Sequence, residues 1–584
     1  MMRRAPIGLR CYAHRRIVGS IAILIFFSLG CSGPIFRPQS PEAGLNLPPT
    51  PDVHLISEYT HAYGMSPIKV EAVSLVTGLA GTGSDPPPSP QRAELLAEMS
   101  RRDVAKPNEM LASSNTSLVL VRGLLRPGIQ EGDHFDVEVR VPSRSETTSL
   151  RGGYLLSTRL TELAVLGEQI RQGNLLASAE GPVLVDPSAD SKSNPAVVTQ
   201  GRILGGGVAV KSRSLGLVIG HEYQSVRLSQ QIASSVNHRF FTFVSGRKQG
   251  VATPKTDEFI DLIIQPRYKD NVARYIRIVR NISVNESPHE LQDRLLLLEH
   301  QLADPLTAAN AAIRLEAIGN EQAIGILNQN VAATDPEVRF YAAEALAYLD
   351  QTSAVQTLAD GARDEPAFRV NSLAALSAMN DVTAYDALRS LLEVSSAETR
   401  YGAFRALWAM NQRDPFIRGE RLGDQFELHV LDVPGPKMVH VTRSYRPEIV
   451  MFGKDQRFEL PLVLDAGNNI LVNGQSGDKI TVSKFSPGAE PQQKVVSSSV
   501  VDVIRAIVDL GGTYPDVVQA LQQAKKDGSL TSRFAVDALP QSGRQYDHDV
   551  HEHAERHTDD PAADSQDAPV DVSTPMPNLF TQER

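Results

Sequence analysis

The amino-acid sequence predicts an α+β protein in which an all-α helical solenoid separates two mixed regions. Three observations predict this class. Short strand patterns and glycine-rich turns fill residues 64–290 and return over residues 420–540. Between them, residues 291–415 are dominated by Ala and Leu and repeat with a regular period. A chain of 584 residues is also longer than one ordinary hydrophobic core, so several folding units are expected.

The first mixed region carries both strand and helix periodicities. From Phe135 to Val141, apolar and charged residues alternate, which is the pattern of a half-buried strand. Phe259 to Ile264 is nearly all apolar and predicts a strand buried on both faces. Leu228, Ile232 and Val236 recur every four residues and predict one face of a helix.

The middle region repeats every 30 or 31 residues. Equivalent positions of successive units hold Leu315, Leu346, Leu376 and Leu407, and the following helices hold Ala323, Ala354 and Ala384. An acidic residue followed by proline opens the units, as expected for a helix N-cap with Pro in the first turn: Asp304-Pro305, Asp335-Pro336 and Glu365-Pro366. The pattern resembles HEAT-type repeats and indicates about four stacked units, each burying its apolar face against its neighbours.

The second mixed region ends in two predicted helices. Val500, Val503, Ile504, Ile507 and Leu510 form an apolar stripe. Ser499 is the expected N-cap of this helix, and Gly511-Gly512 is its expected end. The second helix begins near Pro515.

The two chain ends predict segments without a packed core. Five arginines precede the uncharged stretch Ile17–Gly30, so residues 1–30 are predicted to be a signal peptide. The run Ser28–Ser32 resembles a bacterial lipobox, which would make Cys31 a lipidated N-terminus; an ordinary signal peptide with an incidental Cys is the alternative. Residues 31–63 are predicted to be a disordered tether and residues 541–584 a disordered, acidic, His-rich tail.

Composition limits the classes of partner. The net charge of -10 argues against nucleic acid as a partner, because phosphate binding needs clustered Lys and Arg. The two cysteines are Cys11 and Cys31, and the first would leave with the signal peptide. No disulfide is therefore expected in the mature chain.

No catalytic, cofactor or metal site is predicted. The glycine-rich run Gly78–Gly83 lacks the Lys-Ser/Thr ending of a phosphate loop and is expected to be a tight turn. A cluster of histidines in the tail could hold a metal only adventitiously, and it comprises His548, His551, His553 and His557. Trp408 is expected in a core or capping role. Three arginines recur at the repeat period and predict either structural ion pairs or a basic stripe for an acidic partner: Arg339, Arg369 and Arg400.

Several motifs resemble the bacterial flagellar P-ring protein family. Ser74–Asp85, with its Gly-Thr-Gly step, is similar to the N-terminal hallmark of that family. Further similar motifs follow in the family's order: Ser149–Gly153, Leu155-Leu156, Gln172–Leu175, Gly201–Ile203, Gly206–Val208, Leu228–Ala233 and Val500–Leu521. The resemblance departs from the family's pattern where the repeats interrupt it and at Cys31, because the family is usually secreted without a lipid.

The resemblance implies a structural function. Members of the family form a homo-oligomeric ring around the flagellar rod in the periplasm, at the peptidoglycan layer, and catalyse no reaction. The expected partners are therefore copies of the chain itself, the rod and L-ring proteins and peptidoglycan, with membrane attachment through Cys31 if that residue is lipidated. An alternative from a different class is an envelope scaffold lipoprotein, independent of flagella, that binds a protein partner through its HEAT-like repeats.

Overall fold

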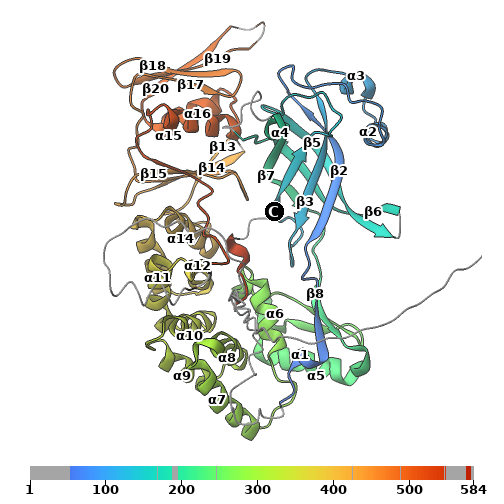
Figure 1. Cartoon of the computed structure of the whole chain (residues 1–584), viewed down its shortest axis with the longest axis vertical. Helices are drawn as coiled ribbons and strands as arrows, with labels where there is room; N and C mark the ends of the chain where they lie inside the picture. Colours follow the sequence, from blue (N-terminus) through green and yellow to red (C-terminus); the bar gives the residue numbers. More distant parts are fainter. Residues whose placement is uncertain are drawn as a thin grey trace, which may run out of the picture. The chain divides into compact units, whose positions relative to one another are not determined.

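The computed structural model describes residues 53–166, 169–186, 195–244, 246–423, 425–486, 488, 490–544, 546 and 574–580. Figure 1 shows strand-rich regions and a stack of helices, in keeping with the predicted α+β class with helical repeats. Within these residues, no helix combines the length and apolar character that a membrane crossing requires.

The first region contains a closed six-stranded barrel in which every pair of neighbouring strands is antiparallel. Its strands, in the order around the barrel, are β2 (Ile68–Thr77), β3 (Ser117–Leu125), β4 (His134–Arg140), β7 (Gln200–Ala209), β6 (Gln169–Pro182) and β5 (Tyr154–Leu166). The predicted strand at Phe135 is confirmed, because Phe135, Val137 and Val139 are buried while Glu138 and Arg140 are exposed. Outside the barrel wall, α2 (Pro90–Arg101) and α3 (Pro107–Leu111) bury Leu95, Met99 and Leu111 in a small satellite core.

The barrel is followed by a small α/β layer. Its four-stranded sheet has the order β1 (Thr60–Tyr63), β8 (Leu215–Ile219), β12 (Phe259–Leu262) and β11 (Ala252–Pro254). The sheet belongs with α1 (Ile56–Tyr59), η1 (His221–Tyr223), α5 (Val226–Arg239), η2 (Pro266–Tyr268), α6 (Val272–Arg280) and the hairpin β9 (Phe241–Val244) to β10 (Arg247–Gly250). The short helix α4 (Pro195–Val198) belongs to the barrel, whose core contains Val198. Ile232 and Val236 of α5 are buried, as predicted.

Two predictions for this layer are wrong. Residues 56–63, placed in the disordered tether, form α1 and β1. The strand was missed because its sheet partner, β8, lies far along the chain. The strand at Phe259 is buried on one face only: Ile260 and Leu262 point into the core, whereas Ile263 is 47% exposed.

Eight helices form the repeat array: α7 (Pro288–Leu302), α8 (Pro305–Ile318), α9 (Glu321–Asn330), α10 (Pro336–Tyr348), α11 (Val355–Asp364), α12 (Arg369–Ala378), α13 (Val382–Ser390) and α14 (Ala397–Met410), with the short turns η3 (Thr352–Ala354) and η4 (Leu391–Glu393). The repeat-position leucines and alanines are confirmed as core residues, since all seven are almost fully buried. The side chains of Asp304 and Asp335 cap α8 and α10. Glu365 does not cap α12, which begins at Arg369 after a turn that contains Pro366.

The region after the repeats contains two further sheets. One is mixed, in the order β13 (Glu420–Leu422), β14 (Phe426–Leu431), β16 (Glu448–Phe452), β15 (Met438–Val441) and β21 (Arg533–Val536). The other is antiparallel, in the order β17 (Leu462–Ala466), β18 (Ile470–Gly474), β19 (Lys479–Lys484) and β20 (Gln492–Ser497). Figure 1 shows α15 (Val500–Asp509) and α16 (Tyr514–Lys526) between these sheets, where their apolar faces share one core.

Details at the ends of these helices correct the prediction. Ser499 occupies the N-cap position of α15, but its side chain makes no capping hydrogen bond. Gly511 follows the helix with a positive φ of 83°, as expected for a glycine that ends it. In the chain's tail, residues 574–580 were expected to be disordered, yet they contain the short helix η5 (Asn578–Phe580) with Leu579 and Phe580 buried.

Candidate functional site

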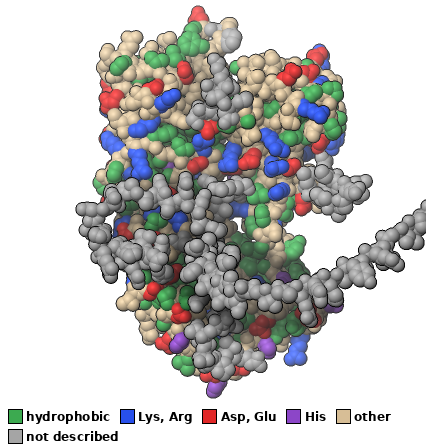
Figure 2. All heavy atoms as spheres, in the orientation of Figure 1, with side chains coloured by type: hydrophobic (Ala, Val, Ile, Leu, Met, Phe, Trp, Pro, Cys, Tyr) green, Lys and Arg blue, Asp and Glu red, His purple; other side chains and the backbone are tan. Residues whose placement is uncertain are grey.

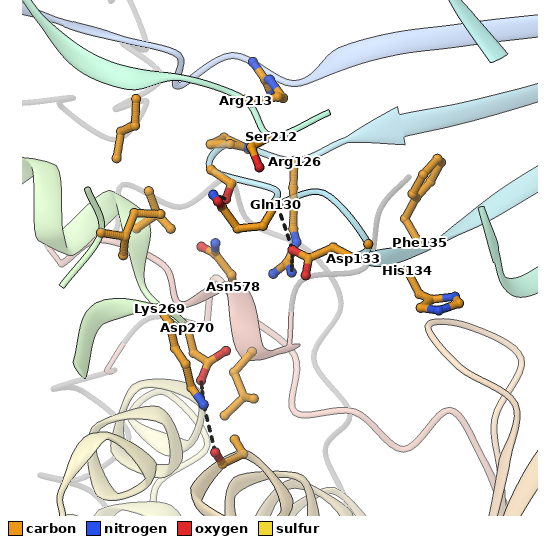
Figure 3. Close-up of a pocket in the computed structure, with 18 of the residues that line it drawn as sticks. Arg126, Gln130, Asp133, His134, Phe135, Ser212, Arg213, Lys269, Asp270 and Asn578 are labelled. Atoms are coloured by element: carbon orange, nitrogen blue, oxygen red, sulfur yellow. Dashed lines mark hydrogen bonds and ion pairs between the residues drawn. The ribbon is translucent and has the colours of Figure 1, made fainter. Parts of the chain in front are cut away.

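A cavity of about 1020 Å³ lies where the β3–β4 loop meets the start of α6 and the last repeat. Figure 3 shows residues of its wall from the β3–β4 loop and β4, from the segment after β7, from the segment before α6, and from the tail. The labelled residues are Arg126, Gln130, Asp133, His134, Phe135, Ser212, Arg213, Lys269, Asp270 and Asn578.

Polar groups of this wall bond one another or the backbone. A guanidinium nitrogen of Arg126 lies 3.1 Å from Asp133 Oδ2, which also accepts the backbone N–H of Gln130 at 3.0 Å. Lys269 Nζ donates to the carbonyl oxygen of Ala409, at the end of the repeats, over 2.9 Å (Figure 3). These bonds fix the shape of the β3–β4 loop and connect the start of α6 to the last repeat.

Two carboxyl groups of the cavity wall have raised pKa values. Burial raises the pKa of Asp136 to about 7, although hydrogen bonds from the backbone N–H groups of Gly205 and Tyr445 act in the opposite direction. Burial also raises the pKa of Asp270, against the lowering effect of Lys269. Such pKa values suit a general acid or base. Asp136, however, uses one oxygen for Gly205 N (2.8 Å) and the other for Tyr445 N (2.6 Å), so it braces the barrel against the β15–β16 loop.

The barrel makes further contacts with the region after the repeats. Arg443 pairs with Asp186 over 2.5 Å. Leu184 and Leu204, which belong to the barrel segment, pack into the core of the later region. The two mixed regions are thus in contact, although each strand of the later region pairs only within its own two sheets.

A buried ion network joins α6 to the first repeats. Arg274 lies 2.5 Å from Glu316 of α8 and 2.7 Å from Glu344 of α10, and all three side chains are buried. Tyr268 also donates its hydroxyl to Glu316 over 2.7 Å. Burial alone would lower the pKa of Arg274, but the two carboxylates raise it, so the guanidinium stays charged. Burial raises the pKa of Glu344, and Arg274 opposes that effect.

A second buried network joins the last repeat helix to the mixed sheet. The hydroxyl of Tyr401 in α14 donates to Glu448 of β16 over 2.5 Å, and Arg446 forms an ion pair with the same carboxylate. Burial would raise the pKa of Glu448, but the charges of Arg446 and Arg405 hold it at about 2. Burial lowers the pKa of His440, whose ring stacks on Tyr401, to about 3.

The structure describes the glycine-rich run and the periodic arginines that the sequence singled out. Gly78–Gly83 is an irregular segment with a bend at Ala80-Gly81, and its ends donate backbone hydrogen bonds to Ser114 and Asn115. A Cβ on Gly83 would lie 2.0 Å from the carbonyl oxygen of Thr116. Among the residues that the structure describes, Arg369 is the one periodic arginine that forms an ion pair with the next unit, at Glu398. The other two donate to backbone carbonyls: Arg339 to Ala333 and Thr334, and Arg400 to Leu392 and Pro436.

Trp408 lies in the cavity wall at the end of α14. It is half-buried, and the guanidinium of Arg446 lies 3.5 Å from the centroid of its ring. This contact fits the capping role predicted for Trp408, because Arg446 belongs to the region that follows the repeats.

The predicted lipidation site and the histidine cluster lie outside the described residues: Cys31, His548, His551, His553 and His557. Within the described ranges, no group of three His, Cys, Asp or Glu side chains is placed to hold a metal ion. On the face drawn in Figure 2, basic and acidic side chains are interspersed.

The sequence analysis missed both buried networks. Glu344 stands in the otherwise apolar stretch 341–349 of an Ala-rich helix, and that isolation is a usable signal, because an unpaired carboxylate is too costly to bury. The signal at Glu316 is weaker, because Arg314 lies two residues before it. The partner of these carboxylates, Arg274, carries no comparable signal. Its neighbours in α6 include Arg277 and Arg280, so the sequence does not distinguish the buried arginine.

Comparison with known families divides the chain at the start of the repeats. Residues 56–296 match the family described as flagellar P-ring protein, and residues 293–377 match HEAT repeats. Both predicted resemblances are thereby confirmed. The first match begins at α1, in agreement with the structure and not with the predicted boundary at residue 64. It ends within α7, the first helix of the array, so it does not include residues 420–540.

Similar curated proteins carry the name flagellar P-ring protein. One from Sodalis glossinidius is 25% identical over 309 residues, which cover 51% of this chain and 79% of that protein. One from Escherichia fergusonii is 24% identical over 291 residues, covering 49% and 76%. One from Wigglesworthia glossinidia brevipalpis is 28% identical over 247 residues, covering 40% and 62%.

Proposed function

We propose that this chain is a non-catalytic structural subunit of the bacterial flagellar basal body, which assembles with copies of itself into a periplasmic ring around the rod. The observation that carries the proposal is the P-ring match over residues 56–296, because it spans the barrel together with the complete α/β layer. The named relatives and the signal-like N-terminus support the same compartment.

In this proposal, residues 420–540 complete the subunit after the repeat module. The ion pair between Arg443 and Asp186 and the bonds of Asp136 support it, because they connect this region to the matched one. A closed ring requires a head-to-tail interface between unlike surfaces. The exposed aromatic hairpin β9–β10 is a suitable contact: Phe243 is 69% exposed and stacks edge-on against Phe241.

Deletion of the gene, combined with electron microscopy of purified basal bodies, tests the proposal. We expect the deletion to abolish motility and to remove a ring at the periplasmic level of the rod. Complementation with a Phe243→Ser variant should restore soluble protein but fewer rings, whereas Val463→Ser, an exposed apolar residue outside the matched region, should restore both. Intact rings in the deletion strain would refute the proposal.

The alternative is an envelope scaffold lipoprotein that binds a protein through its repeats, and the HEAT match together with the lipobox-like Ser28–Cys31 favours it. Metabolic labelling with a fatty acid tests the lipid, and the motility of the deletion strain separates the two functions. If Cys31→Ser abolishes labelling while Cys11→Ser does not, the chain is a lipoprotein. Normal motility of the deletion strain would then favour the scaffold.

A further inference from the structure

The C-terminal segment Thr574–Phe580 is held by hydrogen bonds along its length. At its start, Asn371 of α12 donates to the Thr574 hydroxyl over 2.5 Å, and Asn271 donates to the carbonyl oxygen of Pro575 over 3.4 Å. At its end, the backbone N–H of Asn578 donates to the carbonyl oxygen of Asp270 over 2.7 Å, and the Tyr445 hydroxyl donates to the carbonyl oxygen of Asn578 over 3.3 Å. Three of these four hydrogen bonds involve the backbone of the segment, and the one from Asn371 reaches its Thr574 side chain.

The apolar side chains of the segment supply the buried contact. Leu579 and Phe580 are only 6% and 4% exposed, and they belong to the same hydrophobic core cluster as the repeat helices. Met576 packs against this cluster while half-buried. The buried Leu-Phe pair therefore resembles the few buried side chains that supply most of the binding energy at a protein interface.

The receiving surface has its own rigid support. Asn271 and Asn371 are 1% and 5% exposed, so their side-chain amides are fixed in place. Asn371 also donates to Glu344, which is paired with Arg274 in the buried network of the first repeats. Asn271 also donates to the Tyr348 hydroxyl of α10 over 3.3 Å. The amides that hold the segment are therefore oriented by contacts that do not involve it.

The segment contributes one short helical turn, η5, to the fold. It forms no strand, and residues 547–573 separate it in sequence from Tyr546, which stacks on Phe368 near Asn371. These 27 residues link the segment covalently to the rest of the chain, and an extended chain can reach up to about 3.3 Å per residue.

We propose that the surface formed by Asn271, Asn371, Tyr445 and the adjoining repeat helices is a peptide-binding site, filled in this chain by its own segment Thr574–Phe580. The site takes a short segment that accepts a hydrogen bond from Asn371 at a side-chain hydroxyl and one from Asn271 at its backbone, and whose Leu-Phe pair enters the core. The covalent link supplies a high effective concentration, so the chain's own segment competes with any partner peptide of the same chemistry. This inference does not depend on the flagellar assignment.

Fluorescence anisotropy with a labelled synthetic peptide of residues 570–584 tests the site. The acceptor is the chain ending at residue 573, and the full-length chain is the comparison. We expect the shortened chain to bind the peptide and the full-length chain to bind it at least tenfold more weakly. A Phe580→Ala peptide should bind at least tenfold more weakly than the natural one, because the anchor is truncated.

Variants of the acceptor locate the binding surface. Asn371→Ala in the shortened chain should weaken peptide binding severalfold, whereas Asn380→Ala, an exposed asparagine two residues after α12, should not. If shortening unfolds the chain, a full-length acceptor with Leu579→Ala and Phe580→Ala replaces it. We call the shortened chain and the double variant emptied acceptors, because neither carries the intact segment. The proposal would be overturned by any of three results: equal binding of the natural and Phe580→Ala peptides, equal binding by full-length and emptied acceptors, or no binding by a folded emptied acceptor.

Discussion

The barrel and the repeat array differ in how their edge strands and end helices are covered. The barrel closes on itself, so each of its six strands has two neighbours and its main core is apolar. The repeat array is open, and its first and last helices would expose apolar faces. Along the described chain, the first buried charged side chain is Arg274, immediately before the repeats, and the buried arginines and carboxylates that follow gather in and around the array.

The difference indicates how the open array is held between α6 on one side and the mixed sheet on the other. At one end α6 contributes Arg274 to two repeat carboxylates, and at the other end β16 contributes Glu448 to Tyr401 and Arg405. Apolar contacts tolerate many relative orientations, whereas a buried ion pair is favourable only in a narrow geometry. We infer that the two networks fix the orientation of α6 and of β16 against the array, and four experiments test this difference between the array and the barrel.

Arg274→Met should have the largest effect. It leaves Glu316 and Glu344 buried without their cation, and breaking a buried pair in this way costs about 3–5 kcal/mol. Chemical unfolding followed by far-ultraviolet circular dichroism measures the loss. Arg363→Met, which removes an exposed ion pair with Asp360, is the matched control and should cost less than about 1 kcal/mol. Equal losses for the two variants would contradict the anchoring role.

Tyr401→Phe should be the next largest. It removes a hydrogen bond to the buried carboxylate of Glu448, and a bond to a charged group contributes about 1.5–3 kcal/mol. The chain has a single tryptophan, Trp408, in the same helix, so its fluorescence reports unfolding at this end of the array. The exposed Tyr154→Phe variant should leave the Trp408 transition unchanged. An unchanged transition in Tyr401→Phe would remove this hydrogen bond from the anchoring network.

Gly207→Ala tests the packing of the apolar barrel core. A Cβ at this position in the barrel would lie 2.7 Å from the ring of Phe135, and overpacking of this kind costs about 1–3 kcal/mol. Adding Phe135→Leu should recover part of that loss, because the smaller side chain makes room. The double variant is compared with both single variants by chemical unfolding. Strictly additive losses would show that the ring is not the obstacle.

His440 should give the smallest effect, and only in acid. Its pKa is about 3 in the folded chain against 6.5 as the reference, so the unfolded chain takes up the proton first. The stability from neutral His440, whose Nε2 accepts the N–H of Ala538, is complete above pH 6.5 and is lost as the pH falls toward 3.

The pH effect is measured against a variant that cannot titrate. Between pH 6.5 and about 5, the wild type should lose up to about 1.4 kcal/mol per pH unit relative to His440→Gln. The exposed His289→Gln variant should follow the wild type throughout. Parallel pH profiles for the wild type and His440→Gln would exclude a buried neutral imidazole.

The elements that sequence reasoning located correctly are those with a strong local period. The leucines and alanines of the repeats are buried at the positions that the 30- or 31-residue step assigns, and the alternation after Phe135 gives β4. Caps were less reliable: Asp335 caps its helix, whereas Glu365 and Ser499 do not. A cap depends on the backbone geometry of a single residue, which a neighbouring proline or serine only suggests.

Local periodicity was enough to predict the helical repeat and the buried side of β4 and of the repeat helices, because side-chain direction follows directly from a period of 3.6 or 2 residues. Which charges meet, and where the segment Thr574–Phe580 lies, depends on the tertiary fold. Asn371 and Thr574 are 203 residues apart, and Tyr445 and Asp136 are 309 residues apart. No local pattern encodes such pairs, since they arise from packing between elements that the periodicity treats separately.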